Sequence, residues 1–145
     1  MAAQAAIEMT LIIDTSVAIA WCARSQSTAM TQAAEEFVVD YGGMAPAHFQ
    51  LELVHSLHRL ERSRRLQAQV LDAFLFGFPT YALQYDLVAV DHVASLVLPL
   101  ARQWGLGLYD AAYLELALRL QLPIATRDKQ LAAATIAAGG TLFAP

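Results

Sequence analysis

The 145-residue chain is 57% hydrophobic and 15% charged, which predicts one domain with a full core and an apolar face left over for a partner or a second copy. Its formal net charge of −4 argues against bulk electrostatic binding of DNA or RNA. The single cysteine, Cys22, excludes an internal disulfide and favours a reducing, cytoplasmic setting, and no uncharged stretch is long enough to span a bilayer.

The first predicted elements lie within residues 9–21, MTLIIDTSVAIAW. Residues 11–13 form a short apolar run that is typical of a buried strand, and the run ends at Asp14. Two hydroxyl residues follow, and a second group of apolar residues begins at Val17. This pattern indicates a tight turn and the start of a helix. An acid at the carboxyl end of a buried parallel strand lies where open α/β sheets form their ligand crevices. The sequence therefore places a candidate site at Asp14.

Strands and helices alternate along the rest of the chain. We expect a loose leader over residues 1–8 and a single domain over residues 9–145. Strands are predicted at residues 10–13, 44–45, 86–90, 123–126 and 141–143. Helices are predicted at residues 16–23, 29–40, 46–63, 67–76, 92–104, 109–120 and 129–138. This order favours an α/β fold in which helices cover both faces of a parallel sheet.

The predicted helix at residues 46–63 carries a polar stripe beside its leucines. His48, Glu52, His55 and Arg59 fall at positions i, i+4, i+7 and i+11, so they share one side of the helix. The end of this helix is rich in arginine. The four arginines are Arg59, Arg62, Arg64 and Arg65. They suit contacts with RNA phosphates, and they equally suit a solvated helix end, where cations favour the helix dipole.

Four acids stand out by their positions. Asp14 and Asp128 each end a predicted strand, Asp110 begins a helix and Glu52 lies within one. Mg²⁺ and Mn²⁺ prefer oxygen ligands, and acids that converge from distant segments can hold such ions for hydrolysis of a phosphodiester. Each acid also has a purely structural explanation, because the aspartates suit helix caps and Glu52 suits a solvated face. Spacing alone leaves both interpretations open.

Three segments together resemble the PIN-domain family, of the VapC type found in bacterial toxin–antitoxin pairs: IIDTSVAIAW, PAHFQLELVHSL and LYDAAYLELALRLQLPIATRDKQL. Their order along the chain is more specific than any one of them. The resemblance covers residues 9–143 and implies a three-layer α/β/α sandwich with a central, mainly parallel sheet of four or five strands. It also implies a metal-dependent endoribonuclease that uses Mg²⁺ or Mn²⁺, acts on RNA, is held inactive by a cognate antitoxin and forms a homodimer.

The resemblance also implies roles for individual residues. The family's metal-binding and catalytic acids match Asp14, Glu52, Asp110 and Asp128. Ser16 and Thr126 match hydroxyl positions that help to orient metal, water or acid, and His55 stands where the family usually has a small polar residue. Arg127 and Lys129 flank Asp128, so we expect them to contact RNA phosphates.

Other protein classes fit the sequence less well. A haloacid-dehalogenase-type phosphatase needs a second aspartate two residues after the first, where this chain has Ser16. A response-regulator receiver needs an early acidic pair, a nucleotide-binding module needs a glycine-rich loop after its first strand, and the histidines lack the spacing of a zinc site. The remaining alternative to a nuclease is a PIN-like protein that binds RNA or a partner without cutting.

Overall fold

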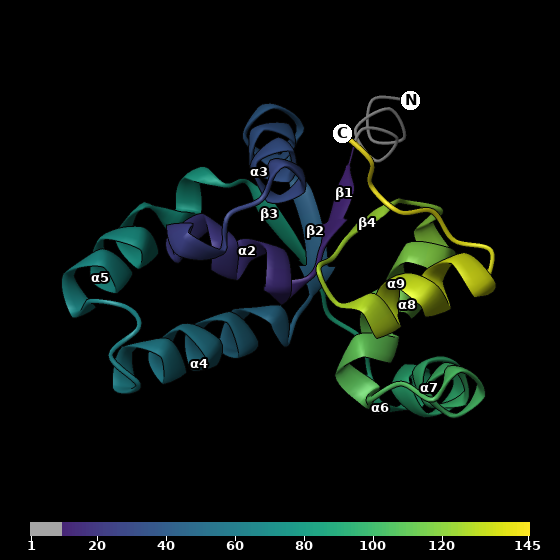
Figure 1. The fold of residues 1–145 in the computed structure, drawn as a ribbon. Coiled ribbons are helices and arrows are strands. Elements are labelled where there is room, and N and C mark those ends of the chain that lie inside the picture. The colour runs from purple at the N-terminus through teal and green to yellow at the C-terminus, as the bar shows by residue number, and fades with distance from the viewer. Residues whose placement is uncertain (1–9) are drawn as a thin grey trace.

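The structure is a computed structural model that describes residues 10–145, so the expected leader at residues 1–8 and the first residue of the expected domain lie outside the described residues. Within them, the centre of the fold is a parallel sheet with the strand order β3-β2-β1-β4 (Figure 1). The strands are β1 (Leu11–Ile13), β2 (Gly43–Pro46), β3 (Leu83–Asp86) and β4 (Ile124–Ala125).

Helices cover both faces of this sheet. Their bounds are Thr15–Cys22 (α2), Ala29–Tyr41 (α3), Phe49–Arg62 (α4), Ala68–Gly77 (α5), Val90–His92 (α6), Leu98–Trp104 (α7), Leu108–Leu120 (α8) and Lys129–Ala137 (α9), with 3₁₀ turns at Arg24–Gln26 (η1) and Phe78–Thr80 (η2) and a π-helical segment at Val93–Val97 (η3). Helices α2 to α5 group on one side of the sheet and α7 to α9 on the other, with α8 against the strands (Figure 1). The three-layer α/β/α prediction is confirmed.

Strand β1 is the buried centre of the molecule. It lies between β2 and β4, and Leu11, Ile12 and Ile13 are all fully buried. A parallel strand that is covered on both faces needs a continuous apolar run rather than an alternating one, which is why the sequence identified it. The burial fixes the carboxyl end of β1, and with it the position of Asp14.

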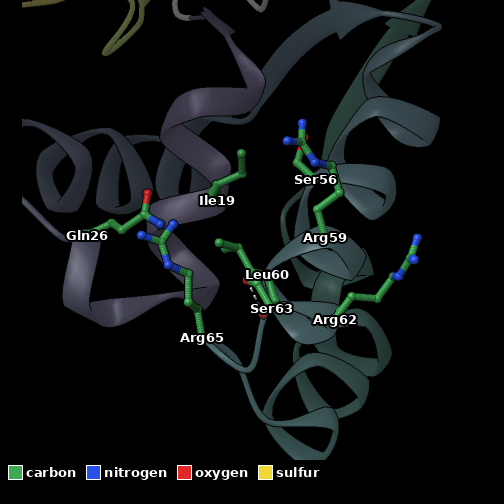
Figure 2. A pocket seen from close by; sticks show the side chains of 8 residues that line it. All are labelled: Ile19, Gln26, Ser56, Arg59, Leu60, Arg62, Ser63 and Arg65. Atoms are coloured by element: carbon green, nitrogen blue, oxygen red, sulfur yellow. Dashed lines mark hydrogen bonds between the residues drawn. The ribbon is translucent and has the colours of Figure 1, made fainter.

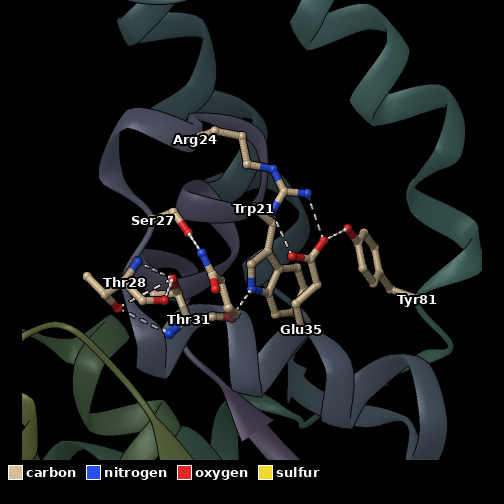
Figure 3. Close-up of polar contacts among 8 residues, drawn as sticks. Trp21, Arg24, Ser27, Thr28, Thr31, Glu35 and Tyr81 are labelled. Atoms are coloured by element: carbon tan, nitrogen blue, oxygen red, sulfur yellow. Dashed lines mark hydrogen bonds and ion pairs between the residues drawn. The ribbon is translucent and has the colours of Figure 1, made fainter.

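Polar contacts hold α2 and the η1 turn after it against α3, and hold α3 against the segment after η2 (Figure 3). The indole nitrogen of the buried Trp21 donates a hydrogen bond to the carbonyl of Thr31 at 2.9 Å. The Glu35 carboxylate accepts two hydrogen bonds from Arg24, at 2.8 and 3.0 Å, and one from the Tyr81 hydroxyl at 2.5 Å. These contacts fix the orientation of α2, which begins directly after Asp14.

The third strand differs from its prediction. A strand was expected at residues 86–90, but β3 occupies Leu83–Asp86 and the chain then leaves the sheet. Leu87 is 87% exposed and Val90 is 81% exposed, so the apolar run that suggested a strand lies on the surface. Because β3 is an edge strand and only partly buried, its sequence does not need a continuous run of apolar residues, and the strand was not recognised there.

Three other expectations also need correction. Pro46 was expected to open a helix, but it ends β2 and α4 begins three residues later, because its fixed φ suits an extended chain as well. The helix expected at residues 92–104 begins two residues earlier, at Val90, so that Asp91 lies in its first turn. The edge strand expected at residues 141–143 is reduced to one bridge between Leu142 and β4. No described helix is long and apolar enough to cross a bilayer.

Candidate active site

The four acids that the sequence singled out line one cleft, with a volume of about 630 Å³. They come from four separate segments. Asp14 follows β1, Glu52 lies in the first turn of α4, Asp110 lies in the first turn of α8 and Asp128 precedes α9. The carboxyl ends of the parallel strands β1 and β4 lie at the same edge of the sheet, so Asp14 and Asp128 meet there.

Asp14 is buried and held by two hydroxyl groups. It is 5% exposed, and its Oδ2 accepts hydrogen bonds from Ser16 Oγ at 2.6 Å and from Thr126 Oγ1 at 2.7 Å. Burial raises the pKa of Asp14, and these two hydrogen bonds act in the opposite direction. Its side chain makes no capping bond to α2, so the helix-cap interpretation does not apply to Asp14.

Backbone amides orient the two hydroxyl groups toward Asp14. The amide of Arg127 donates to Ser16 Oγ at 2.9 Å, and the amide of Asp128 donates to Thr126 Oγ1 at 3.0 Å. Each hydroxyl oxygen therefore accepts from the loop after β4, and its own proton is directed to Asp14. The structure thus brings Ser16 and Thr126 to the first acid, where they fix the direction of its carboxylate.

Glu52 is held by a second pair of hydroxyl groups. Its Oε1 accepts hydrogen bonds from Thr15 Oγ1 and, at 3.0 Å, from the Tyr113 hydroxyl. The two hydroxyl oxygens are themselves 2.8 Å apart. Tyr113 is fully buried, and this burial raises its pKa, so it stays a neutral donor. Glu52 therefore points into the protein and not onto a solvated face.

The two remaining acids differ in their local roles. Asp110 accepts no hydrogen bond from any described residue, and the N-cap of α8 is Gly107. Burial raises the pKa of Asp110 to about 6, and the negative charges of Asp14, Asp128 and Glu52 add to this effect. Asp128 does cap its helix, because its Oδ1 accepts from the amides two and three residues later at 2.8 and 3.0 Å. The cap interpretation is thus right for Asp128, which also lines the cleft.

Every acid keeps an oxygen that accepts no hydrogen bond within the described part of the chain. These oxygens are Asp14 Oδ1, Glu52 Oε2, Asp128 Oδ2 and both oxygens of Asp110. Carboxylate oxygens are the ligands that Mg²⁺ and Mn²⁺ prefer, so the donor set fits such an ion. In residues 10–145, no group of three or more His, Cys, Asp or Glu side chains already surrounds a common point as metal ligands do.

Aromatic side chains form another wall of the cleft, and their place there was not predicted from the sequence. His48 stacks on Tyr109 with ring centroids 4.8 Å apart, and its Nε2 is buried without a hydrogen-bond partner among the described residues. Burial lowers the pKa of His48, so its ring is neutral at pH 7. Its place four residues before Glu52 in the polar stripe was the available signal. Tyr113 lies one helical turn after Asp110, but nothing in the sequence indicates its bond to Glu52.

The expected RNA-contact residues flank the cleft without lining it. Arg127 and Lys129 are both exposed. The guanidinium of Arg127 donates a hydrogen bond to Gln26 Oε1 at 3.0 Å, which directs it away from Asp128 and toward η1. A phosphate contact by either residue therefore remains a prediction.

The family profile of the PIN domain matches residues 11–136. The chain belongs to the PIN-domain family. PIN domains are generally nucleases that use divalent metals, so membership supports a hydrolase acting on nucleic acid. The search of curated proteins finds no significant match. The crystal structure of PAE2754 from Pyrobaculum aerophilum is similar, with a TM-score of 0.59, 19% sequence identity, and coverage of 87% of this chain and 84% of that chain. At this identity the likeness supports the PIN fold alone.

Proposed function

We propose that this PIN-domain protein is a Mg²⁺- or Mn²⁺-dependent endoribonuclease that hydrolyses RNA phosphodiester bonds. The observation that carries the proposal is the cleft itself, which is lined by four carboxylates from distant segments, each with an oxygen that accepts no hydrogen bond from the described residues. Helix capping explains only Asp128, and it explains only one of that residue's oxygens. A shared cation is the simplest reason to gather four negative charges where burial already raises the pKa of two of them.

The chain's residues have distinct tasks in this proposal. Asp14, Glu52, Asp110 and Asp128 would hold the ion, because all four line the cleft and each has an oxygen without a hydrogen bond from the described residues. When bound, the ion supplies a water of lowered pKa and offsets charge on the scissile phosphate. Ser16 and Thr126 donate hydrogen bonds to Oδ2 of Asp14, so Oδ1 is the atom of this carboxylate that would bind the ion. The hydroxyl of Tyr113 does the same for Glu52, leaving Oε2.

The alternative is a PIN protein that binds RNA or a partner without cutting. One observation favours it, namely that no three potential ligands in the described residues are already arranged around a common point. Cleavage of a labelled single-stranded RNA, measured in EDTA and with increasing Mg²⁺ or Mn²⁺, separates the two functions. The nuclease proposal predicts cleavage only with metal.

Matched variants sharpen this assay. Asp14→Asn should abolish cleavage, because it removes a ligand without changing the size of the side chain. Asp72→Asn is the control, since Asp72 is an exposed acid on α5 outside the cleft lining. Full cleavage by a folded Asp14→Asn protein, or loss of cleavage in Asp72→Asn as well, would contradict the assignment.

The proposed biological setting is the toxin of a toxin–antitoxin pair, in the cytoplasm and as a homodimer. The resemblance of the three segments to VapC-type proteins supports this setting, and exposed apolar side chains such as Phe76 and Leu87, 92% and 87% exposed, offer apolar surface for a second copy. Induced expression should arrest growth, Asp14→Asn should not, and co-expression of the product of a neighbouring gene should relieve the arrest. Normal growth during expression of the active protein would argue against a toxin.

A further inference from the structure

A second hollow next to the acid cleft is lined by arginines, and we propose that it binds the phosphate backbone of the RNA strand whose scissile phosphate lies in the cleft. This inference rests on the proposed ribonuclease function and adds the path of the substrate. The hollow, called here the arginine hollow, has a volume of about 570 Å³. Its lining consists of Ile19, Gln26, Ser56, Arg59, Leu60, Arg62, Ser63 and Arg65 (Figure 2).

The three arginines of the hollow are exposed and unpaired. Arg59, Arg62 and Arg65 take part in no ion pair among residues 10–145, whereas Arg24 and Arg119 are both paired with acids. The segment from Arg59 to Arg65 carries four of the chain's nine basic residues. In a protein with a net charge of −4, so many free cations at one place favour a polyanionic ligand over a merely solvated surface.

The chain turns at the end of α4 in a way that gathers these side chains. Arg64 has a left-handed φ of 61°, and the amide of Arg65 donates back to the carbonyl of Leu60 at 2.8 Å. The turn directs Arg65 toward Gln26 of η1, as Figure 2 shows. Gln26 also accepts a hydrogen bond from Arg127 at 3.0 Å. Arg65 and Arg127 therefore both lie beside the neutral Gln26, so that cationic side chains extend from the arginine hollow to the residue before Asp128.

The arginine hollow and the acid cleft share a wall. Ile19 and Ser56 line both. The polar stripe of α4 joins them, because His55 and Glu52 face the cleft while Arg59 faces the hollow. Glu52 and Arg59 are seven positions apart, which is about 10 Å along a helix. One extended strand can therefore place a phosphate at the acids and the neighbouring phosphates on the arginines.

Charge explains why an RNA nuclease of this composition needs such a site. The carboxylates of the cleft repel a polyanion, and burial together with their mutual repulsion is already strong enough to raise the pKa of Asp110. Free guanidinium groups at the border offset that repulsion and contact phosphate oxygens with their planar, forked donors. An acidic protein segment would also be attracted, but the continuity with the cleft favours a nucleic-acid strand.

The test measures binding of a fluorescent single-stranded RNA by anisotropy, in EDTA so that cleavage does not interfere, over a series of KCl concentrations. For a single strand, each phosphate contact contributes about 0.7 to the slope of log affinity against log salt. Arg62→Gln and Arg65→Gln should each reduce the slope by about this amount. Arg102→Gln is the matched control, because Arg102 is exposed on α7, outside the hollow and without an ion pair among the described residues. It should leave the slope unchanged.

Three results would overturn the inference: unchanged slopes in the hollow variants, an equal reduction in Arg102→Gln, or arginine-dependent binding of a polyglutamate peptide in place of RNA. A parallel cleavage assay of the wild-type protein with Mn²⁺ keeps the two proposals apart. Cleavage by the wild type with unchanged slopes in the variants would refute the arginine hollow alone. If the wild type does not cleave RNA but binds it through the arginines, the nuclease proposal is refuted. The assignment of the arginine hollow to the strand that is cut is then refuted as well.

Discussion

Replacing Asp110 with asparagine should make the metal-free protein more stable while it removes nuclease activity. Burial and the charges of three neighbouring acids raise the pKa of Asp110 from 3.8 to about 6. At full strength this rise corresponds to a penalty of roughly 3 kcal/mol on the ionised carboxylate, and the solvent in the open cleft reduces the penalty to about 1–2 kcal/mol. Asparagine carries no charge, so the variant escapes this penalty.

The sign of the effect depends on pH. Between about pH 4 and pH 6 the folded wild type holds a proton on Asp110 that the unfolded chain has released. The wild type therefore loses stability relative to Asp110→Asn as the pH rises through this window, and the difference persists above it. At pH 8 the variant should melt higher by about 4 °C, and below pH 4 the two melting temperatures should agree.

Thermal unfolding in EDTA at pH 4, 6 and 8 measures this difference. Asp72→Asn serves as the control, because its exposed carboxylate lies outside the cleft and should show no such pH-dependent gain. Addition of Mn²⁺ should reverse the order, since an ion that binds only the folded wild type stabilises it by mass action. A variant that is less stable than the wild type in EDTA at pH 8 would refute the clustering of charges at Asp110.

Further predictions concern the groups that hold the acids and the core beneath them. Tyr113→Phe removes a hydrogen bond to Glu52 and should weaken Mn²⁺ binding by calorimetry about tenfold or more; unchanged affinity would show that Glu52 needs no such support. Thr126→Ala removes a bond that lowers the pKa of Asp14, so the acidic limb of the pH–rate profile should move to higher pH, and an unmoved limb would count against Asp14 as a catalytic group. Leu57→Ala should cost about 2–5 kcal/mol in the free energy of unfolding by urea, because Leu57 is fully buried; a loss below 1 kcal/mol would mean that the α4 contact is not part of the core.

The sequence was most informative where burial or helical spacing left a clear pattern. The apolar run before Asp14 predicted β1, because a strand that is covered by helices on both faces has apolar residues at every position. The polar stripe of α4 predicted that His48, Glu52 and His55 share a side, and all three line the cleft. The order of the three family-like segments predicted the PIN fold, which the family match confirms.

The features that the sequence did not predict depend on contacts between distant segments. The hydrogen bond from Tyr113 to Glu52 joins residues 61 positions apart, and no local pattern records it. The edge strand β3 was misplaced because the neighbouring apolar run proved to be exposed surface. The arginines at the end of α4 were visible as a cluster, but only the fold shows that they border the acid cleft and adjoin Gln26.

A crystal of the protein grown with Mn²⁺, and measured at a wavelength where manganese scatters anomalously, shows directly whether the acids of the cleft bind a metal ion. We expect an anomalous peak in the cleft, in direct contact with carboxylate oxygens of Asp14 and Asp110. A map at saturating Mn²⁺ with no peak there, or with manganese bound only elsewhere on the surface, would contradict this expectation.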